Sequence, residues 1–190
     1  MQSHYIELLA IPQADMLTAE TMGYILQTVH RALPQYAGRI GIGFPLYAPY
    51  HSLGNMLRLY GNESDICHIN NHLQTQGLAD YAVFRQPEQI PDKHQFACFS
   101  RVRLKTPSAS DIRRMQKRCQ QQGLSPDEIA NRIQQWRNKS PSKPPAFAYI
   151  NSTSTGQRMP LFITKRDKIE AQTGTFNAYG LSQNSTVPVF

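Results

Sequence analysis

The sequence has no long apolar run and little cysteine. No apolar stretch reaches the roughly 20 residues that span a bilayer as a helix, and the opening residues, MQSHYIELLAIPQ, lack the basic start of a signal peptide. The three cysteines are scattered without a CxxC pair, which is typical of reduced thiols and not of a disulfide framework. These absences argue against a membrane-spanning or a secreted protein, so we expect a cytoplasmic one.

A metal-binding motif is also lacking. His68 and His72 stand four residues apart in an expected helix, but no glutamate lies between them. Cys67 would point about 100° away around that helix. A solvated helix face is therefore the better interpretation, and we expect neither a metal site nor a cofactor.

Hydroxyl side chains are concentrated in NSTSTGQ, residues 151–157. Such a run could be a flexible linker, a glycosylation acceptor, or a loop that holds a ligand rich in oxygen and charge. Glycosylation matters only in a secreted protein. A linker is not expected between two apolar strands, and FAYI and LFITK flank the run. We favour the ligand-holding loop.

Charge is unevenly distributed. Residues 1–92 carry 4 basic and 8 acidic side chains, a net charge of −4, whereas residues 93–143 carry 12 basic and 3 acidic ones, a net charge of +9. Residues 144–190 carry 4 and 2, a net charge of +2. A concentrated basic segment predicts one anion-binding face, for which nucleic acid is the usual partner.

The first half alternates strands and helices. The predicted order is β-α-β-β-α-β, an α+β, ferredoxin-like arrangement that many RNA-binding domains use. Its elements are the strand HYIELLAI, a helix from Thr18 stopped by Pro34, the strands RIGIGFP and NMLRLY, a helix around 66–73, and the strand DYAVF.

A domain boundary is expected in the proline-containing segment 86–92, which has no periodicity. We therefore predict a ferredoxin-like domain over residues 1–90 and a smaller α+β domain with a basic helix over 91–190. The second domain should contain the strand HQFACFSRVRLK, a helix over 112–121, a helix from Ser125, the linker SPSKPP, and strands around FAYI, LFITK and TFNAY.

Two basic elements follow one another in this second domain. Alternation along a strand places on one face Arg101, Arg103 and Lys105. The next helix carries, opposite its apolar side, two columns of like charge, Arg113, Arg114, Lys117 and Arg118. A solvated basic face is the plain alternative, but the direct succession of strand and helix favours contact with a phosphate backbone and guanine edges.

His30 is the one histidine of interest in the first helix. It sits between Leu26 and Leu33 at the border of the apolar stripe. Taken alone, a histidine in such a position is structural more often than catalytic.

Five segments in this order resemble the CRISPR-RNA processing endoribonucleases of type I-F systems, over essentially the whole of residues 4–190. They are RIGIGFP, SRVRLK, IRRMQKR, STSTGQ and AYGLS…VPVF. The resemblance implies a ferredoxin-like domain and a smaller domain that together grip a CRISPR repeat hairpin. It also implies cleavage at the 3′ base of that hairpin by attack of the RNA's own 2′-hydroxyl, without a metal.

By position, the resemblance assigns His30 as the catalytic histidine and Ser152 as the serine that holds the ribose, with Ser154 in support. Tyr179 matches a tyrosine that orients the histidine, and Arg101 an arginine that reads a guanine. The RNA-binding set would further comprise Arg103, Lys105, Arg113, Arg114, Lys117, Arg118 and Met159.

Two positions depart from the family pattern. The residue two places after Arg101 is usually a glutamine that reads adenine, and here Arg103 would prefer guanine or a phosphate. The aromatic residue that stacks on the terminal base pair is replaced by Met159, an apolar but ring-free platform. Repeat specificity should differ accordingly.

The expected products are a mature crRNA, with a 2′,3′-cyclic phosphate on the upstream fragment, and a 5′-hydroxyl downstream. The resemblance also implies that the enzyme stays bound to the crRNA hairpin with the other subunits of the type I-F surveillance complex. A hairpin-binding subunit that does not cleave is the main alternative, and a general basic RNA-binding protein is a weaker one.

Overall fold

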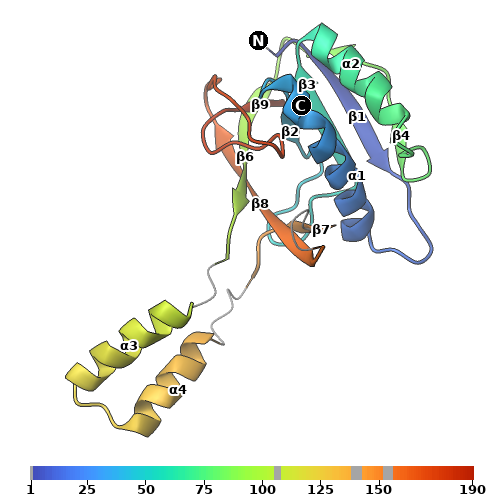
Figure 1. The fold of residues 1–190 in the computed structure, drawn as a ribbon. Helices are drawn as coiled ribbons and strands as arrows, with labels where there is room; N and C mark the ends of the chain where they lie inside the picture. Colours follow the sequence, from blue (N-terminus) through green and yellow to red (C-terminus); the bar gives the residue numbers. More distant parts are fainter. Residues whose placement is uncertain (1, 105–107, 138–142, 152–155) are drawn as a thin grey trace. The chain divides into compact units, whose positions relative to one another are not determined.

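The computed structural model describes residues 2–104, 108–137, 143–151 and 156–190 (Figure 1). The chain divides into two compact units. The larger unit contains Met1–Val102 and Pro145–Phe190, and the helical unit contains Arg103–Pro144. None of the helices within the described ranges has the length and apolar character needed to cross a bilayer.

The first sheet of the larger unit confirms the predicted ferredoxin-like order. Its strands are arranged β2-β3-β1-β4, all antiparallel, and the short β5 also pairs with β1. Helices α1 and α2 contact each other and both contact β1 (Figure 1). The elements are β1 (His4–Ala10), α1 (Thr18–Ala32), β2 (Gly41–Gly43), β3 (Met56–Gly61), α2 (Glu63–Gln74), β4 (Ala82–Phe84) and β5 (Glu88–Gln89).

Proline ends the first helix as the sequence predicts. A 3-10 helix, η1 (Leu33–Tyr36), with Pro34 at its start, follows α1 directly. A proline has no backbone N–H to donate to the preceding turn, so the regular α-helix stops there.

The centre of this sheet buries one charged pair. Glu7 in β1 and Arg58 in β3 are both buried, and an Arg58 nitrogen lies 2.6 Å from a Glu7 carboxylate oxygen. The Arg58 guanidinium also donates to the carbonyl oxygen of Phe190 at 3.0 Å and lies 4.0 Å from the centre of the Phe190 ring. Arg58 thus satisfies a buried carboxylate and fixes residue 190 against β3.

The second sheet has the order β7-β8-β6-β9, again antiparallel. It shares the core of the first sheet, since Phe44 and Phe99 meet edge to face at 5.4 Å between ring centres. The fold is therefore α+β, as predicted, while the expected domain boundary near residue 90 stays a prediction. The strands of this sheet are β6 (Gln95–Val102), β7 (Phe147–Asn151), β8 (Arg158–Lys168) and β9 (Val187–Val189).

Two strand predictions are wrong in extent or kind. The strand predicted through Lys105 ends at Val102, so Arg103 lies beyond the sheet. The segment TFNAY, residues 175–179, is irregular and ends in a turn. There the side-chain oxygen of Asn177 accepts the backbone N–H of Tyr179 at 2.8 Å and that of Leu181 at 3.3 Å. These two backbone N–H groups are therefore bonded to a side chain within the turn and not to a neighbouring strand.

The helical unit is a hairpin of α3 (Ala109–Gln121) and α4 (Pro126–Arg137). Each helix begins with a capping box. Ser108 and Asp111 exchange hydrogen bonds at the start of α3, and Ser125 and Glu128 do so at the start of α4. Its own small apolar cluster consists of Cys119, Ile129 and Ile133, with Ile112, Met115 and Leu124 packed against them.

Candidate active site

His30 lies in the last turn of α1, with a partly exposed ring. Its Nδ1 stands 2.5 Å from the carbonyl oxygen of Ala178. Because a carbonyl oxygen only accepts hydrogen bonds, Nδ1 carries the proton in this contact. In the neutral ring Nε2 is then unprotonated, so it is the nitrogen that can take up a proton.

The ring of Tyr179 stacks on the imidazole. The two ring centres are 4.0 Å apart and the planes differ by 6°. The guanidinium carbon of Arg101, at the end of β6, lies 5.4 Å from the centre of the same tyrosine ring. Three residues singled out in the sequence, His30, Tyr179 and Arg101, are therefore brought together from α1, β6 and the turn before β9.

The turn that carries Tyr179 depends on a glycine. Gly180 has a φ of +67°, which L side chains rarely adopt, and a Cβ there would lie 2.4 Å from Cγ1 of Ile42. The backbone N–H of Ile42 donates to the carbonyl oxygen of Gly180 at 2.8 Å. The turn is thus fixed against β2, and it holds both the Ala178 carbonyl and the Tyr179 ring in place beside His30.

One stripe of α1 faces the second sheet and the turn. It consists of Glu20, Gly23, Gln27 and His30, whose spacings of 3, 4 and 3 residues place them within about 80° on the helix. A Cβ added at Gly23 would lie 1.7 Å from the carbonyl oxygen of Tyr149 in β7. The helix therefore approaches β7 at backbone contact distance, which only glycine permits.

The same stripe holds both ends of the loop that follows β7. Buried Gln27 accepts the backbone N–H of Asn151, the last residue of β7, at 2.8 Å. Glu20 forms an ion pair with Arg158, the first residue of β8, and the Arg158 guanidinium carbon lies 4.1 Å from the centre of the Tyr149 ring. The backbone N–H of Leu17 and the guanidinium of Arg158 lower the pKa of Glu20. Asn151 and Arg158 are paired in the sheet, so α1 anchors the two flanks of the hydroxyl-rich loop.

One protein family matches nearly the whole chain, including every element that contributes to this site. The family is described as "CRISPR-associated protein (Cas_Csy4)", and the match covers residues 5–190. The chain belongs to this family.

Two relatives resemble the chain over almost its full length. One, from Pseudomonas aeruginosa (strain UCBPP-PA14), is 30% identical over 190 residues, which is 98% of this chain and 99% of the relative. The other, from Escherichia coli (strain UTI89 / UPEC), is 27% identical over 190 residues, with the same coverage of both chains. Both carry the name CRISPR-associated endonuclease Cas6/Csy4. The family that the sequence motifs resembled is therefore confirmed.

Three of the residues assigned by resemblance to the Cas_Csy4 family lie outside the described ranges, namely Ser152, Ser154 and Lys105. Arg103 is exposed. Met159, in β8, is half-buried, pairs with Ile150 of β7 and packs against the core. One side of the Met159 side chain therefore contacts apolar core residues.

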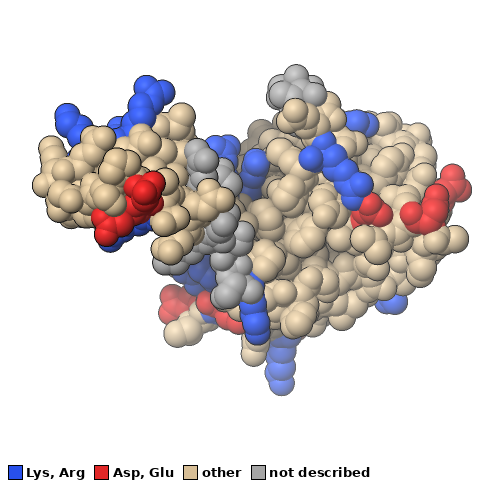
Figure 2. All heavy atoms as spheres, turned by 90° about the horizontal axis from the view of Figure 1, so that it is seen from below, with Lys and Arg blue, Asp and Glu red and all other residues tan. Residues whose placement is uncertain are grey.

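The basic helix of this family member is α3. The four predicted cations, Arg113, Arg114, Lys117 and Arg118, are all exposed. Basic side chains stand out on the surface in Figure 2. The opposite side of α3 packs on α4 through Met115 and Cys119, so the polarity of the helix predicted from its sequence is confirmed.

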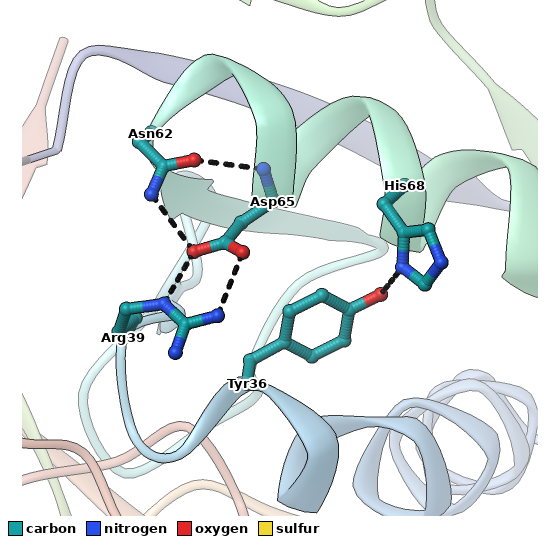
Figure 3. Close-up of polar contacts among 5 residues, drawn as sticks. All are labelled: Tyr36, Arg39, Asn62, Asp65 and His68. Carbon is teal, nitrogen blue, oxygen red and sulfur yellow. Dashed lines mark hydrogen bonds and ion pairs between the residues drawn. The ribbon is translucent and has the colours of Figure 1, made fainter.

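His68 has a hydrogen-bond partner within the protein. Its ring forms a 2.7 Å hydrogen bond between Nδ1 and the hydroxyl of Tyr36 (Figure 3). Burial raises the pKa of Tyr36 to about 12. The described residues contain no group of three or more His, Cys, Asp or Glu side chains placed to hold a metal ion.

Gln27 and Glu20 were not anticipated from the sequence. The apolar stripe of α1 predicts one buried face, and both residues lie on the other side of the helix. That side is covered by β7, which comes 115 or more residues later in the chain. A glycine on the same side, Gly23, is the local signal of a close approach that could have revealed the second contact.

Proposed function

We propose that the protein is a metal-independent endoribonuclease that cleaves a CRISPR repeat hairpin at its 3′ base. The observation that carries this proposal is the His30 ring, held by the Ala178 carbonyl and stacked on Tyr179 with Nε2 left to accept a proton. Membership of the Cas_Csy4 family and relatives named as CRISPR-associated endonucleases support the same reaction.

The chemistry needs one base and an aligned phosphate. Nε2 of His30 takes the proton of the ribose 2′-hydroxyl, and the resulting oxygen attacks the adjacent phosphorus. The bond to the 5′-oxygen breaks, and that oxygen leaves and takes up a proton from water, while His30 releases its proton to the solvent. The upstream product ends in a 2′,3′-cyclic phosphate and the downstream product begins with a 5′-hydroxyl.

The remaining site residues position the RNA. Ser152, with Ser154 in support, holds the ribose of the scissile nucleotide by hydroxyl hydrogen bonds. Tyr179 restrains the imidazole, and Arg101, in the same cluster, reads a guanine edge near the cut. The anchoring of both loop flanks to α1 supports this assignment. The same helix then carries His30, the proposed general base, and holds the two ends of the loop.

The basic residues bind the RNA. The four cations of α3, with Arg103 and Lys105, neutralise phosphates or contact base edges, and Met159 gives an apolar platform for the terminal base pair. After cleavage the protein stays on the crRNA hairpin and joins the other subunits of a type I-F surveillance complex.

The test is cleavage of an end-labelled repeat hairpin from the host's CRISPR array, in EDTA. Wild type and His72→Ala, a histidine variant on α2, should cleave, while His30→Ala should lose about 10²- to 10⁴-fold in rate. A 2′-deoxy nucleotide at the cut should block cleavage by the wild type.

Three other results would each contradict one part of the proposal. Tight binding of the hairpin without cleavage would identify a non-cleaving hairpin-binding subunit. Cleavage that survives the 2′-deoxy substitution would exclude attack by the RNA's own hydroxyl, and equal binding to unrelated hairpins would indicate a general RNA-binding protein.

A further inference from the structure

The helical unit contains a cavity of about 510 Å³ between its two helices. This is within the range of volumes of small-ligand sites in proteins. Both helices contribute side chains to its wall, which include Met115, Arg114, Arg118, Arg132, Gln135 and Trp136. No residue of α4 has an assigned role in RNA binding, so nearly half of this wall has none.

The position of Trp136 is unusual for a hairpin this small. The apolar cluster of the helical unit, within the described residues, is built from Cys119, Ile129 and Ile133 and their neighbours. Trp136 follows Ile133 by three residues, yet it lies outside that cluster and is half-buried at the cavity. One of the largest apolar side chains therefore offers part of its ring to the cavity instead of filling the core.

The cavity wall is strongly basic. It contains three exposed guanidinium groups, those of Arg114, Arg118 and Arg132, none of which forms an ion pair with a described carboxylate. The one carboxylate on the wall, Asp111, accepts the N–H and the hydroxyl of Ser108 in the helix cap. An anion bound in the cavity would supply the opposite charge that these arginines lack among the described carboxylates.

The two charged columns of α3 have separate surroundings. Arg114 and Arg118 line the cavity, whereas Arg113 and Lys117 do not. The columns differ by about 100° around the helix. One column can therefore bind phosphates of a duplex while the other binds a second part of the same RNA.

We propose that the cavity is a subsite for an unpaired nucleotide of the bound RNA. Its phosphate would lie among the three arginines, and its base would stack on the indole of Trp136. An unpaired nucleotide fits better than a paired one, because the faces of paired bases are already covered by their neighbours in the helix. The subsite rests on the proposed function, since the RNA it would take is the substrate.

Trp136 is the only tryptophan in the sequence, so tryptophan fluorescence reports on the cavity. The full chain is titrated with a single-stranded RNA of about eight nucleotides and, separately, with a blunt-ended RNA duplex. The single strand should quench the fluorescence strongly and the duplex should not. No quenching by the single strand, or equal quenching by both, would overturn the subsite.

Variants measured with labelled RNA extend the test. Trp136→Ala should weaken single-strand binding about tenfold, and Trp136→Phe, which keeps a ring, should weaken it less. Arg132→Gln should lower the slope of log affinity against log salt by about 0.7 for the single strand. Gln134→Ala, on the same helix but not on the cavity wall, serves as the control and should change nothing. Unchanged single-strand affinity in both Trp136→Ala and Arg132→Gln would refute the subsite.

Hairpin cleavage by the wild type separates the two proposals. Cleavage without quenching by the single strand means that the enzyme acts as proposed and the cavity is not a nucleotide subsite. Quenching without cleavage means that the nuclease proposal fails while the nucleotide site stands. If Trp136→Ala loses helicity by circular dichroism, the wild-type titrations and Arg132→Gln, an exposed substitution, decide the outcome.

Discussion

At the scale of single residues, the candidate site depends on side chains that position other groups of the protein. Neither Gln27 nor Tyr179 needs to touch the reacting atoms to matter. Gln27 fixes the backbone where the hydroxyl-rich loop begins, and Tyr179 fixes the plane of the His30 ring. Each role can be separated from general stability by a conservative substitution.

Replacing Gln27 with methionine keeps the volume and removes the acceptor. The N–H of Asn151 would then lack its partner in a buried setting, which costs about 1–3 kcal/mol. We expect the free energy of unfolding in urea to fall by that amount. Gln35→Met, at an exposed position of η1, should change it by less than about 0.5 kcal/mol. An equal effect of both substitutions would show that the Gln27 hydrogen bond is unimportant.

Tyr179 should act on His30 through its ring and not through its hydroxyl. Tyr179→Phe keeps the stacked ring, so single-turnover cleavage should stay near the wild-type rate. Tyr179→Ala removes a stacked pair worth about 0.5–1.5 kcal/mol, and we expect the cleavage rate to fall up to about tenfold. If the phenylalanine variant were as slow as the alanine variant, the hydroxyl would have to be the active part.

At the scale of elements, the close packing of α1 on β7 connects His30, the proposed general base, with the hydroxyl-rich loop. Gly23→Ala would gain about 1 kcal/mol of helix propensity, but its methyl group would overlap the Tyr149 carbonyl at 1.7 Å. Because backbone cannot move aside easily, we expect a net loss of stability of about 1–3 kcal/mol and slower cleavage. The control is Gly61→Ala, whose Cβ would meet Ile66 at an ordinary 3.4 Å. A stable, fully active Gly23→Ala protein would contradict the close packing.

A second link between elements should be sensitive to pH. Asp65 in α2 accepts two hydrogen bonds from the Arg39 side chain, at 2.7 and 2.9 Å, and one from Asn62 at 2.9 Å (Figure 3). The Arg39 hydrogen bonds are the main reason that the pKa of Asp65 lies below its usual value. A carboxyl whose pKa is lower in the folded state stabilises the fold above the unfolded-state pKa of about 3.9. This contribution is lost as the pH falls through the folded-state pKa.

Asp65→Asn should therefore lower the free energy of unfolding at neutral pH and hardly change it in acid. We expect urea unfolding at pH 7 to show a loss on the order of 1 kcal/mol. The difference from wild type should shrink when the same measurement is made well below the unfolded-state pKa. A loss that is constant with pH would mean that Asp65 acts by packing and not by its charge.

At the scale of the whole molecule, local signals in the sequence predicted more than long-range ones. The helix that starts after Ser125, the stop at Pro34 and the ferredoxin-like order of elements were predicted from local patterns, and the structure confirms them. By contrast, β5 and β9 have only 2 and 3 residues, too short for an alternating pattern to be visible. The segment TFNAY alternates like a strand, but the Asn177 cap and Gly180 turn it back.

The candidate site shows the same difference between what the sequence predicts and what only long-range contacts reveal. Resemblance to the family, and not local sequence pattern, singled out His30, Tyr179 and Arg101, which the structure brings together. Sequence patterns could not show that β7 covers the polar side of α1, because that contact joins segments more than 100 residues apart. The anchors Glu20 and Gln27 depend on such contacts, whereas the cavity beside Trp136 depends on how α3 packs on α4; both required the structure.

The distribution of charge along the chain leads to a prediction about binding as a whole. Residues 1–92 carry a net charge of −4 and residues 93–143 one of +9, so the salt dependence of hairpin binding should come mainly from the second segment. Removing one cation that neutralises a duplex phosphate lowers the slope of log affinity against log salt by about 0.9. Replacing both Arg113 and Lys117 with glutamine should therefore lower the slope by up to about 1.8.

The same double variant should be at least as stable as the wild type. Both side chains are exposed and lie on α3 at positions i and i+4, where like charges repel by about 0.2–0.5 kcal/mol. Thermal unfolding should thus occur at the same or a slightly higher temperature, while hairpin affinity at low salt drops. The matched comparison is Arg31→Gln together with Arg85→Gln in the first half of the chain, which should leave the slope unchanged. If that pair lowered the slope as much as the α3 pair, the acidic half would contact phosphates as extensively as the basic segment, and the salt dependence would not come mainly from residues 93–143.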